Sequence, residues 1–187
     1  MQDPKIGGSE ERLVIRAALP SEIEWLRAID DDACSLHAEH GLVIAFPTEH
    51  EYARIELARW LRSAELGRAF LAVGEDGTRL GFAALDLVDG EPYLDQLSVR
   101  VAAMRRGIGG RLLALAADWA RVQGKTSVWL TTYAHLPFNR PYYERHGYRV
   151  VPEAECGPGI VAQLDEQRSV LPLPEQRIAM RRDVARS

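Results

Sequence analysis

The most constraining stretch of this sequence is an apolar segment followed by a glycine-rich turn and a run of helix-forming residues. Leu97, Ser98 and Val99 end the apolar segment, and residues 107–110 read Gly-Ile-Gly-Gly before Arg-Leu-Leu-Ala-Leu. Glycine lacks a Cβ atom, and the first N–H groups of a helix have no partner within the helix. Together with the helix dipole, this turn predicts a binding site for an anion such as a pyrophosphate.

Two familiar phosphate-binding patterns do not fit this turn. The dinucleotide fingerprint, begun at Gly107, requires a third glycine where the chain has Leu112. The Walker pattern ends in Gly-Lys-Ser/Thr, which this stretch lacks. A coenzyme A site remains possible. The alternative is a tight turn that binds no ligand, because short glycine patterns also begin ordinary helices.

The stretch resembles motif A of the GNAT N-acetyltransferase superfamily, in which a Leu-x-Val strand precedes an Arg/Gln-x-x-Gly-x-Gly/Ala loop. Met104 departs from the Arg or Gln preferred at the first marked position of the loop. The resemblance implies that backbone N–H groups bind the pyrophosphate of acetyl-CoA, the cosubstrate. The implied cofactor-binding residues on this motif are Leu97, Ser98, Val99, Met104, Arg105, Arg106, Gly107, Ile108, Gly109 and Gly110.

A second motif follows after about thirty residues, a spacing typical of one βαβ unit. Residues 137–148 read Pro-Phe-Asn-Arg-Pro-Tyr-Tyr-Glu-Arg-His-Gly-Tyr and resemble GNAT motif B, Tyr-Glu-x-x-Gly-Phe/Tyr. The resemblance implies that Asn139 contacts the pantetheine arm and that Tyr143 protonates the departing CoA thiolate. A phenol with a pKa of about 10 can protonate a thiolate whose conjugate acid has a pKa near 8.5. Ordinary aromatic packing is the alternative for Tyr143 and the expectation for Tyr142.

Composition predicts one folded domain over residues 12–187, after a flexible segment at 1–11. The 187 residues are 47% apolar, which suffices for one core. No apolar run approaches a membrane span and the N-terminus lacks a signal peptide's apolar segment, so we expect a cytoplasmic chain with no membrane partner. The net charge of −4 and the local clustering of basic residues argue against a nucleic-acid partner.

Hydrophobic periodicity and turn signals predict strands at 13–18, 68–75, 80–88, 93–100, 127–133 and 177–183, and helices from 20, after 48, from 108 and on motif B. Thr48 and Glu51 form a capping-box signal. The helix from 108 is expected to bury Ile108, Leu112, Leu115, Trp119 and Val122, and residues 153–175 are expected to form a long connection. This order matches the GNAT fold, an α/β (α+β) architecture with a mixed central sheet of about seven strands and four main helices.

In the fold that the resemblance implies, the strands at 93–100 and 127–133 splay apart and the pantetheine inserts between them. Backbone groups of Leu97 and Val99 would pair with the cosubstrate and polarise its acetyl carbonyl. Strand alternation places Asp95 on the face of Leu97 and Val99 and makes it a candidate general base, with a structural carboxylate as the alternative. Gln96 is a candidate ligand for the acceptor or a water.

The acidic segment 30–32 lies where the variable helices of the family line the acceptor entrance. Asp31 and Asp32 are therefore candidates for receiving a cationic acceptor, with a solvated helix end as the alternative. Cys34, His37 and His40 are not expected to bind a metal, because steps of three residues on a helix place the first and last about 240° apart.

These observations predict an N-acetyltransferase that moves an acetyl group from acetyl-CoA to a primary amine by direct attack in a ternary complex. The acceptor would be a small amine or a protein amine. Two alternatives stay open: an acetyltransferase for aminoglycoside-type antibiotics, and a non-catalytic acyl-CoA sensor. A homodimer is expected because members of the family often dimerise.

Overall fold

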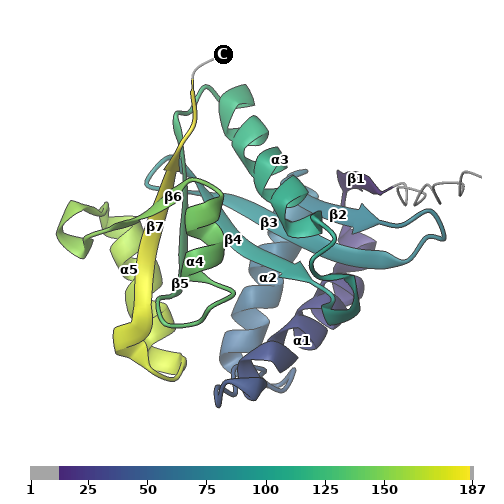
Figure 1. The fold of residues 1–187 in the computed structure, drawn as a ribbon, viewed down its shortest axis with the longest axis horizontal. Coiled ribbons are helices and arrows are strands. Elements are labelled where there is room, and N and C mark those ends of the chain that lie inside the picture. Colours follow the sequence, from purple (N-terminus) through teal and green to yellow (C-terminus); the bar gives the residue numbers. More distant parts are fainter. Residues whose placement is uncertain (1–12, 186–187) are drawn as a thin grey trace, which may run out of the picture.

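The computed structural model describes residues 13–185, which form a seven-stranded mixed sheet (Figure 1). The spatial order is β1-β2-β3-β4-β5-β7-β6, and every pair is antiparallel except β4 and β5. The strands are β1 (Val14–Ala17), β2 (Ala69–Val73), β3 (Arg79–Val88), β4 (Glu91–Val99), β5 (Ser127–Tyr133), β6 (Tyr148–Val151) and β7 (Arg177–Asp183). The predicted mixed sheet is confirmed, whereas the predicted flexible segment 1–11 lies outside the described residues.

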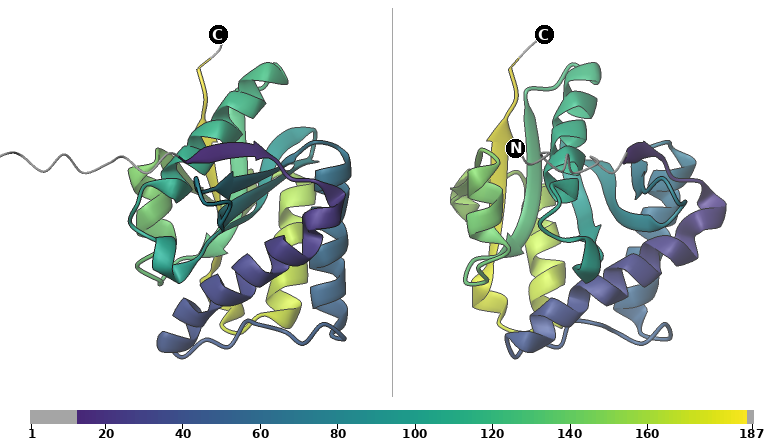
Figure 2. Two further views of the ribbon diagram at one scale, coloured as in Figure 1. Left: turned by 90° about the vertical axis from the view of Figure 1, so that its right-hand side faces the viewer. Right: turned by 45° about the vertical axis from the view of Figure 1, so that its right-hand side comes forward.

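Five α-helices in this part of the chain cover the two faces of the sheet (Figure 2). They are α1 (Ile23–Glu39), α2 (Glu51–Glu65), α3 (Ile108–Val122), α4 (Arg140–Arg145) and α5 (Pro158–Val170). Helices α3 and α4 lie on one face, where the buried side of α3 packs on the strands to form the largest core cluster. Helices α1 and α2 pack on the opposite face over β2 and β3, and α5 packs there over β4, β5 and β7.

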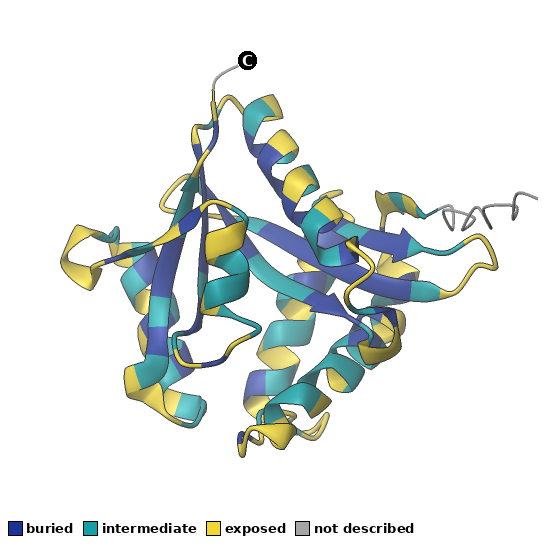
Figure 3. Cartoon of the chain, viewed as in Figure 1, coloured by how far each residue is buried: buried dark blue, intermediate teal, exposed yellow. Residues whose placement is uncertain are grey.

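The buried residues follow the strands and the sheet-facing side of α3 (Figure 3). On α3 this side consists of Ile108, Leu112, Leu113, Ala116, Ala117 and Ala120. The prediction that Val122 is buried is wrong, since 82% of its surface is exposed. Leu115 and Trp119 are half-buried at the edge of this face.

The start of α2 differs from the predicted capping box. His50, rather than Thr48, precedes the first helical residue, and its Nδ1 accepts a hydrogen bond from the Tyr52 N–H at 3.2 Å. An imidazole nitrogen therefore satisfies one of the unpaired N–H groups that every helix start leaves. Tyr52 and Trp60 of this helix are buried.

The prediction that residues 153–175 form only a connection is wrong, because they contain α5. Pro158 occupies the first helical position, where its missing N–H costs nothing. The carboxylate of Asp89 accepts hydrogen bonds from the N–H groups of Gly159, at 2.8 and 3.0 Å, and Ile160, at 3.1 Å. This cap comes from the turn between β3 and β4, far away in the sequence, so local composition could not reveal it.

Candidate active site

Strands β4 and β5 pair only at Tyr93 and Trp129 and then separate (Figure 1). A cavity of about 970 Å³ occupies this separation and passes from one face of the sheet to the other. Its loop side is lined by residues 103–110 and by α4, and its charged side by residues of α1, α2, β4, α5 and β7. The cavity reaches the size of sites that enclose whole ligands. The sequence-based prediction that these strands splay is confirmed.

The loop side begins with a turn whose backbone is set by two residues at positive φ. Arg105 has a φ of 60° and Gly107 a φ of 77°, and α3 begins at Ile108. Within residues 13–185, no side chain caps the start of α3, so its first N–H groups remain available. Every predicted residue from 104 to 110 lines the cavity except Arg106. This arrangement suits an anionic group at the helix start.

Two glycines of the turn are required by packing against α4. A Cβ atom on Gly109 would collide with the Tyr142 hydroxyl, and one on Gly110 would lie 2.9 Å from the His146 ring. The sequence predicts that these glycines let a ligand approach the backbone. The structure shows that they also let α4 lie against the first turn of α3.

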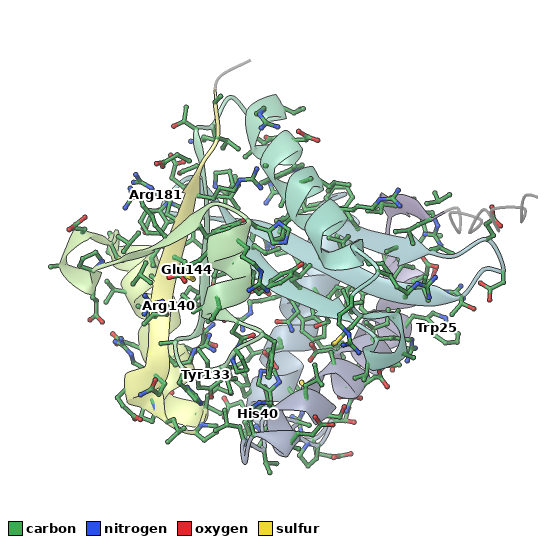
Figure 4. The ribbon with its side chains drawn as sticks, in the orientation of Figure 1. Trp25, His40, Tyr133, Arg140, Glu144 and Arg181 are labelled. Carbon is green, nitrogen blue, oxygen red and sulfur yellow. The ribbon has the colours of Figure 1, made fainter. Side chains whose placement is uncertain are left out.

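Tyr143 and Asn139, which the resemblance assigns to the thiolate and the pantetheine arm, line the same cavity as the glycine turn. The Asn139 carbonyl accepts a hydrogen bond from the Tyr143 N–H at 3.0 Å, which fixes the start of α4. The Tyr143 ring packs edge-on against those of Tyr142 and Tyr148, at centroid distances of 5.6 and 5.7 Å. Burial raises the pKa of the Tyr143 phenol, so it carries its proton at neutral pH. On the exposed side of α4, Arg140 and Glu144 pair at 2.8 Å (Figure 4).

A β-bulge in β4 changes the direction of the Asp95 side chain. Ala84 of β3 faces Gln96 and Leu85 faces Leu94, so Asp95 is the extra residue. An extra residue interrupts the alternation of side chains between the two faces of a strand.

The prediction that Asp95 shares a face with Leu97 and Val99 is therefore wrong. Leu97 and Val99 pack into the core cluster beneath α3, whereas an Asp95 oxygen lies 3.6 Å from Nε of Arg59 on α2. Asp95 still lines the cavity, on its charged side. Burial raises the pKa of Asp95 to about 6, although Arg59 opposes the shift.

Of the acidic segment at 30–32, the structure brings only Asp30 to the cavity, a residue that the sequence analysis did not select. Asp30 accepts hydrogen bonds from Gln96 Nε2 and Ser98 Oγ, both at 2.5 Å. Burial raises the pKa of Asp30. Gln96, the predicted ligand of the acceptor or a water, lines the cavity, and its amide donates a hydrogen bond to Asp30.

The two acids that were selected lie elsewhere. The Asp31 side chain is half exposed and lies 3.5 Å from Arg27, and Asp32 accepts a hydrogen bond from the Val101 N–H at 2.7 Å. Neither lines the cavity. Asp30 and Cys34 lie one helical turn apart on α1, and both line the cavity. The orientation of α1 therefore turns Asp30 inward and leaves Asp31 and Asp32 outside the cavity.

Glu56 on α2 is a second acid that the sequence analysis missed. It lines the cavity and makes no ion pair with any described residue. Burial and the nearby carboxylates of Asp30 and Asp95 raise the pKa of Glu56 to about 8. Tyr52, Glu56 and Arg59 recur at helical spacing and all line the cavity, and polar residues on a buried helix face are the signal that could have revealed the site.

Two cations complete the charged side, the half-buried Arg59 and the buried Arg177. Arg59 joins Asp95 to Glu166 of α5, from which its Nη1 lies 3.0 Å. Arg177 of β7 is 8% exposed, donates to Gln167 Oε1 at 2.6 Å and to Thr131 Oγ1 at 3.4 Å, and lies 4.7 Å from the centre of the Tyr133 ring.

Tyr133, at the end of β5, lies near the C-terminal part of α1, which carries His37 and His40 (Figure 4). His37 lines the cavity, and burial lowers the pKa of His37 to about 4, so the imidazole is neutral at pH 7. Within the described residues, no three His, Cys, Asp or Glu side chains gather to hold a metal ion. No helix in that part of the chain has the length and apolar character needed to cross a membrane.

Comparison with known proteins places this site in a family. The sequence model of the acetyltransferase (GNAT) family matches residues 23–148, which include the glycine turn, the β4 bulge and Tyr143. The chain belongs to the GNAT family. A stretch of 92 residues of this GNAT chain is 38% identical to a streptothricin acetyltransferase of Streptomyces lavendulae. The match covers 48% of the chain and 46% of that protein, so it spans about half the length of the curated relative.

Solved structures of other acetyltransferases share the fold. The PaiA N-acetyltransferase of Thermoplasma acidophilum, solved in complex with coenzyme A, has a TM-score of 0.66 and 15% identity, covering 92% of this GNAT chain and 99% of the other. The N-acetylglutamate synthase of Neisseria gonorrhoeae, complexed with coenzyme A and N-acetyl-glutamate, has a TM-score of 0.64 and 19% identity. That match covers 94% of this chain and 36% of the longer synthase chain. At these identities the likeness shows the fold alone.

Proposed function

We propose that this protein transfers the acetyl group of acetyl-CoA to a primary amine within a ternary complex. The supporting observation is that one cavity joins the glycine turn and Tyr143 on one face of the sheet to an acid-lined region on the other. The turn would bind the pyrophosphate, and the unpaired edge of β4 would pair with the pantetheine amides as an added strand would. The thioester would then lie between β4 and β5, within reach of an amine on the charged side.

The residues around the separation supply the groups that the reaction needs. The amine nitrogen attacks the thioester carbonyl, and a β4 backbone N–H near Leu97 stabilises the oxyanion. Collapse of the tetrahedral intermediate breaks the C–S bond, and the Tyr143 hydroxyl donates its proton to the sulfur. A base must first remove a proton from the ammonium form of the acceptor.

We assign the base to Glu56 in place of Asp95. The Asp95 carboxylate is held by Arg59, whereas Glu56 has no cationic partner among residues 13–185. The pKa of about 8 at Glu56 also lies close to that of an α-amino group, about 8, which favours proton transfer from such an acceptor. Asp95 then acts as a positioning residue that holds Arg59.

The acceptor is a small amine or a protein amine. A streptothricin-type antibiotic is a second candidate, because the relative that is 38% identical over 92 residues is a streptothricin acetyltransferase. This antibiotic candidate replaces the aminoglycoside class as the antibiotic alternative to test first.

The test is mass-spectrometric detection of acetylated product after the purified protein meets acetyl-CoA and a panel of amines. The panel holds peptides, polyamines, amino acids, aminoglycosides and streptothricin. Tyr143→Phe is expected to lower kcat about 100-fold while coenzyme A affinity is retained. Tyr148→Phe is the matched control, because its hydroxyl is buried without a partner in the described structure and does not line the cavity. Coenzyme A binding with no product from any amine would instead support a sensor.

A further inference from the structure

The Arg177 guanidinium is a buried cation that has no carboxylate partner in the described part of the chain. It lines the charged side of the cavity. Its Nη2 donates to Gln167 and Thr131, and its Nε is buried with no hydrogen-bond partner. The Nη1 atom also makes no hydrogen bond, but unlike Nε it is not buried. A buried arginine with vacant donors is costly unless an anion binds there, because the guanidinium stays charged.

Several other titratable side chains of the charged side already have partners. Asp95 and Arg59 form an ion pair that extends to Glu166, and Asp30 accepts two short hydrogen bonds from Gln96 and Ser98. Glu56 makes no ion pair in residues 13–185, although the Arg59 charge acts on it from a distance. The partners of Arg177 there are the neutral Gln167 and Thr131.

Both unpaired charges act on one phenol, that of Tyr52. Tyr52 is 4% exposed and lines the cavity. Burial dominates the rise in the pKa of Tyr52. The charges of Glu56 and Asp95 add to the rise, and those of Arg59 and Arg177 oppose it. Glu56 and Arg177 therefore lie within electrostatic reach of the same hydroxyl, one suited to a cation and the other to an anion.

We propose that Arg177 is an anion subsite and that the acceptor is an amine that also carries a carboxylate, with the amine at Glu56 and the carboxylate at Arg177. This inference rests on the proposed acetyl transfer and names its substrate class. Gln167, Thr131 and the Tyr133 ring hold the guanidinium in place before the acceptor binds. A pre-oriented guanidinium discriminates strongly, because an acceptor without a carboxylate leaves the buried cation unpaired.

The test compares amino acids of increasing chain length with their own amides, at saturating acetyl-CoA. Each amide keeps the amine and the size of its parent acid and removes only the negative charge. We expect kcat/KM for the preferred acid to exceed that for its amide by at least about 30-fold, mainly through KM. Equal rates for acid and amide would overturn the proposal while leaving acetyl transfer intact.

Two variants separate a carboxylate subsite from a structural role. Arg177→Gln is expected to raise KM for the acid about 30-fold and to leave kcat/KM for the amide within about threefold. Gln167→Glu keeps Arg177 and places a carboxylate beside its Nη2. KM for the acid should rise by a similar factor, with kcat/KM for the amide again nearly unchanged. A loss of kcat that is equal for acid and amide in both variants would contradict the assignment.

A binding measurement makes the inference independent of turnover. In the presence of coenzyme A, N-acetylated amino acids should bind the wild-type protein in calorimetry, and their amides should not. Arg177→Gln should abolish that binding, with circular dichroism confirming that the variant is folded. Selective binding of the acids without any acetylated product would contradict the proposed acetyl transfer but support the carboxylate subsite. If the folded protein showed neither a preference for acids over amides nor binding of N-acetylated amino acids, the subsite would be contradicted.

Discussion

The loop side and the charged side of the cavity are built by different means. The loop side consists of backbone N–H groups and close packing from two short stretches, residues 104–110 and α4. The charged side consists of side chains from α1, α2, β4, α5 and β7, which meet only in the folded protein. Under the proposed function the backbone of the loop side holds the cofactor, so a side-chain departure such as Met104 should matter little there. The same proposal makes single side chains decisive on the charged side.

The broadest expected effect, on stability and on ligand binding together, comes from disturbing the packing of the loop side. Gly109→Ala places a methyl group against the Tyr142 hydroxyl and pushes α3 away from α4. We expect the unfolding free energy to fall by about 2 kcal/mol and coenzyme A affinity to fall about 10-fold or more. Thermal unfolding and calorimetry measure the two effects. Adding Tyr142→Phe, which removes the obstructing oxygen, should restore most of both. A Gly109→Ala variant with normal affinity would show that backbone packing is unimportant here.

On the charged side, Glu56→Gln should remove the base and leave coenzyme A affinity unchanged. We expect kcat/KM at pH 8 to fall about 100-fold. The wild-type kcat/KM should rise with pH through an apparent pKa of about 8, and the variant should lose that rise. Asp31→Asn is the matched control, since this half-exposed acid lies outside the cavity. Equal losses in both variants would mean that general negative charge, rather than Glu56, matters.

Glu56 also predicts a stability difference with a definite sign. Its pKa rises from an ordinary 4.5 to about 8 on folding, so the folded state binds the proton more tightly than the unfolded state. Stability of the wild type should therefore fall as pH rises from about 4.5 to about 8. Glu56→Gln should unfold at a higher temperature than the wild type at pH 9, with a gain on the order of 2 kcal/mol. Identical melting curves at pH 9 would refute the raised pKa.

A smaller effect is expected where the charged side depends on α5, which carries Gln167. Asp89→Ala removes the carboxylate that caps this helix and also places alanine at a φ of 54°. We expect a loss of about 1–2 kcal/mol in chemical denaturation. Asp89→Asn, which tolerates the same backbone conformation, should lose less than Asp89→Ala. If alanine and asparagine variants were as stable as the wild type, the cap would not stabilise α5.

The smallest effect is expected at Val122, away from both sides of the cavity. Val122→Lys should change stability by less than about 0.5 kcal/mol, because the side chain is mostly exposed. Leu113→Ala on the same helix should cost about 2–4 kcal/mol, because Leu113 is fully buried. Urea unfolding of the two variants measures the contrast. A large loss for Val122→Lys would indicate that this surface is covered in the native assembly.

The fold and the loop side were largely predictable because their signals are local. Alternating apolar residues, Asp-Gly turns and the glycine turn each depend on neighbours a few positions away. The exceptions are also physical. The helix α5 was missed because its cap, Asp89, lies outside its own segment, and Val122 was misplaced because helical spacing alone does not fix how far the buried face extends.

The charged side was predictable only in part, and the reasons can be named. One bulge residue turned Asp95 from the face of Leu97 toward Arg59. The orientation of α1 brought Asp30 to the cavity and left Asp31 and Asp32 outside it. Neither effect has a signature in the residues themselves.

The sequence by itself determined the mixed sheet, the glycine turn before α3 and the position of Tyr143 on a short helix. These depend on backbone conformation and on periodicity, which neighbouring residues encode. Only the tertiary structure decided which charges share the cavity, because Asp30, Glu56, Asp95 and Arg177 come from four elements. Burial then shifted the pKa of Glu56 and left Arg177 without a partner among the described residues, and burial exists only once the elements have packed.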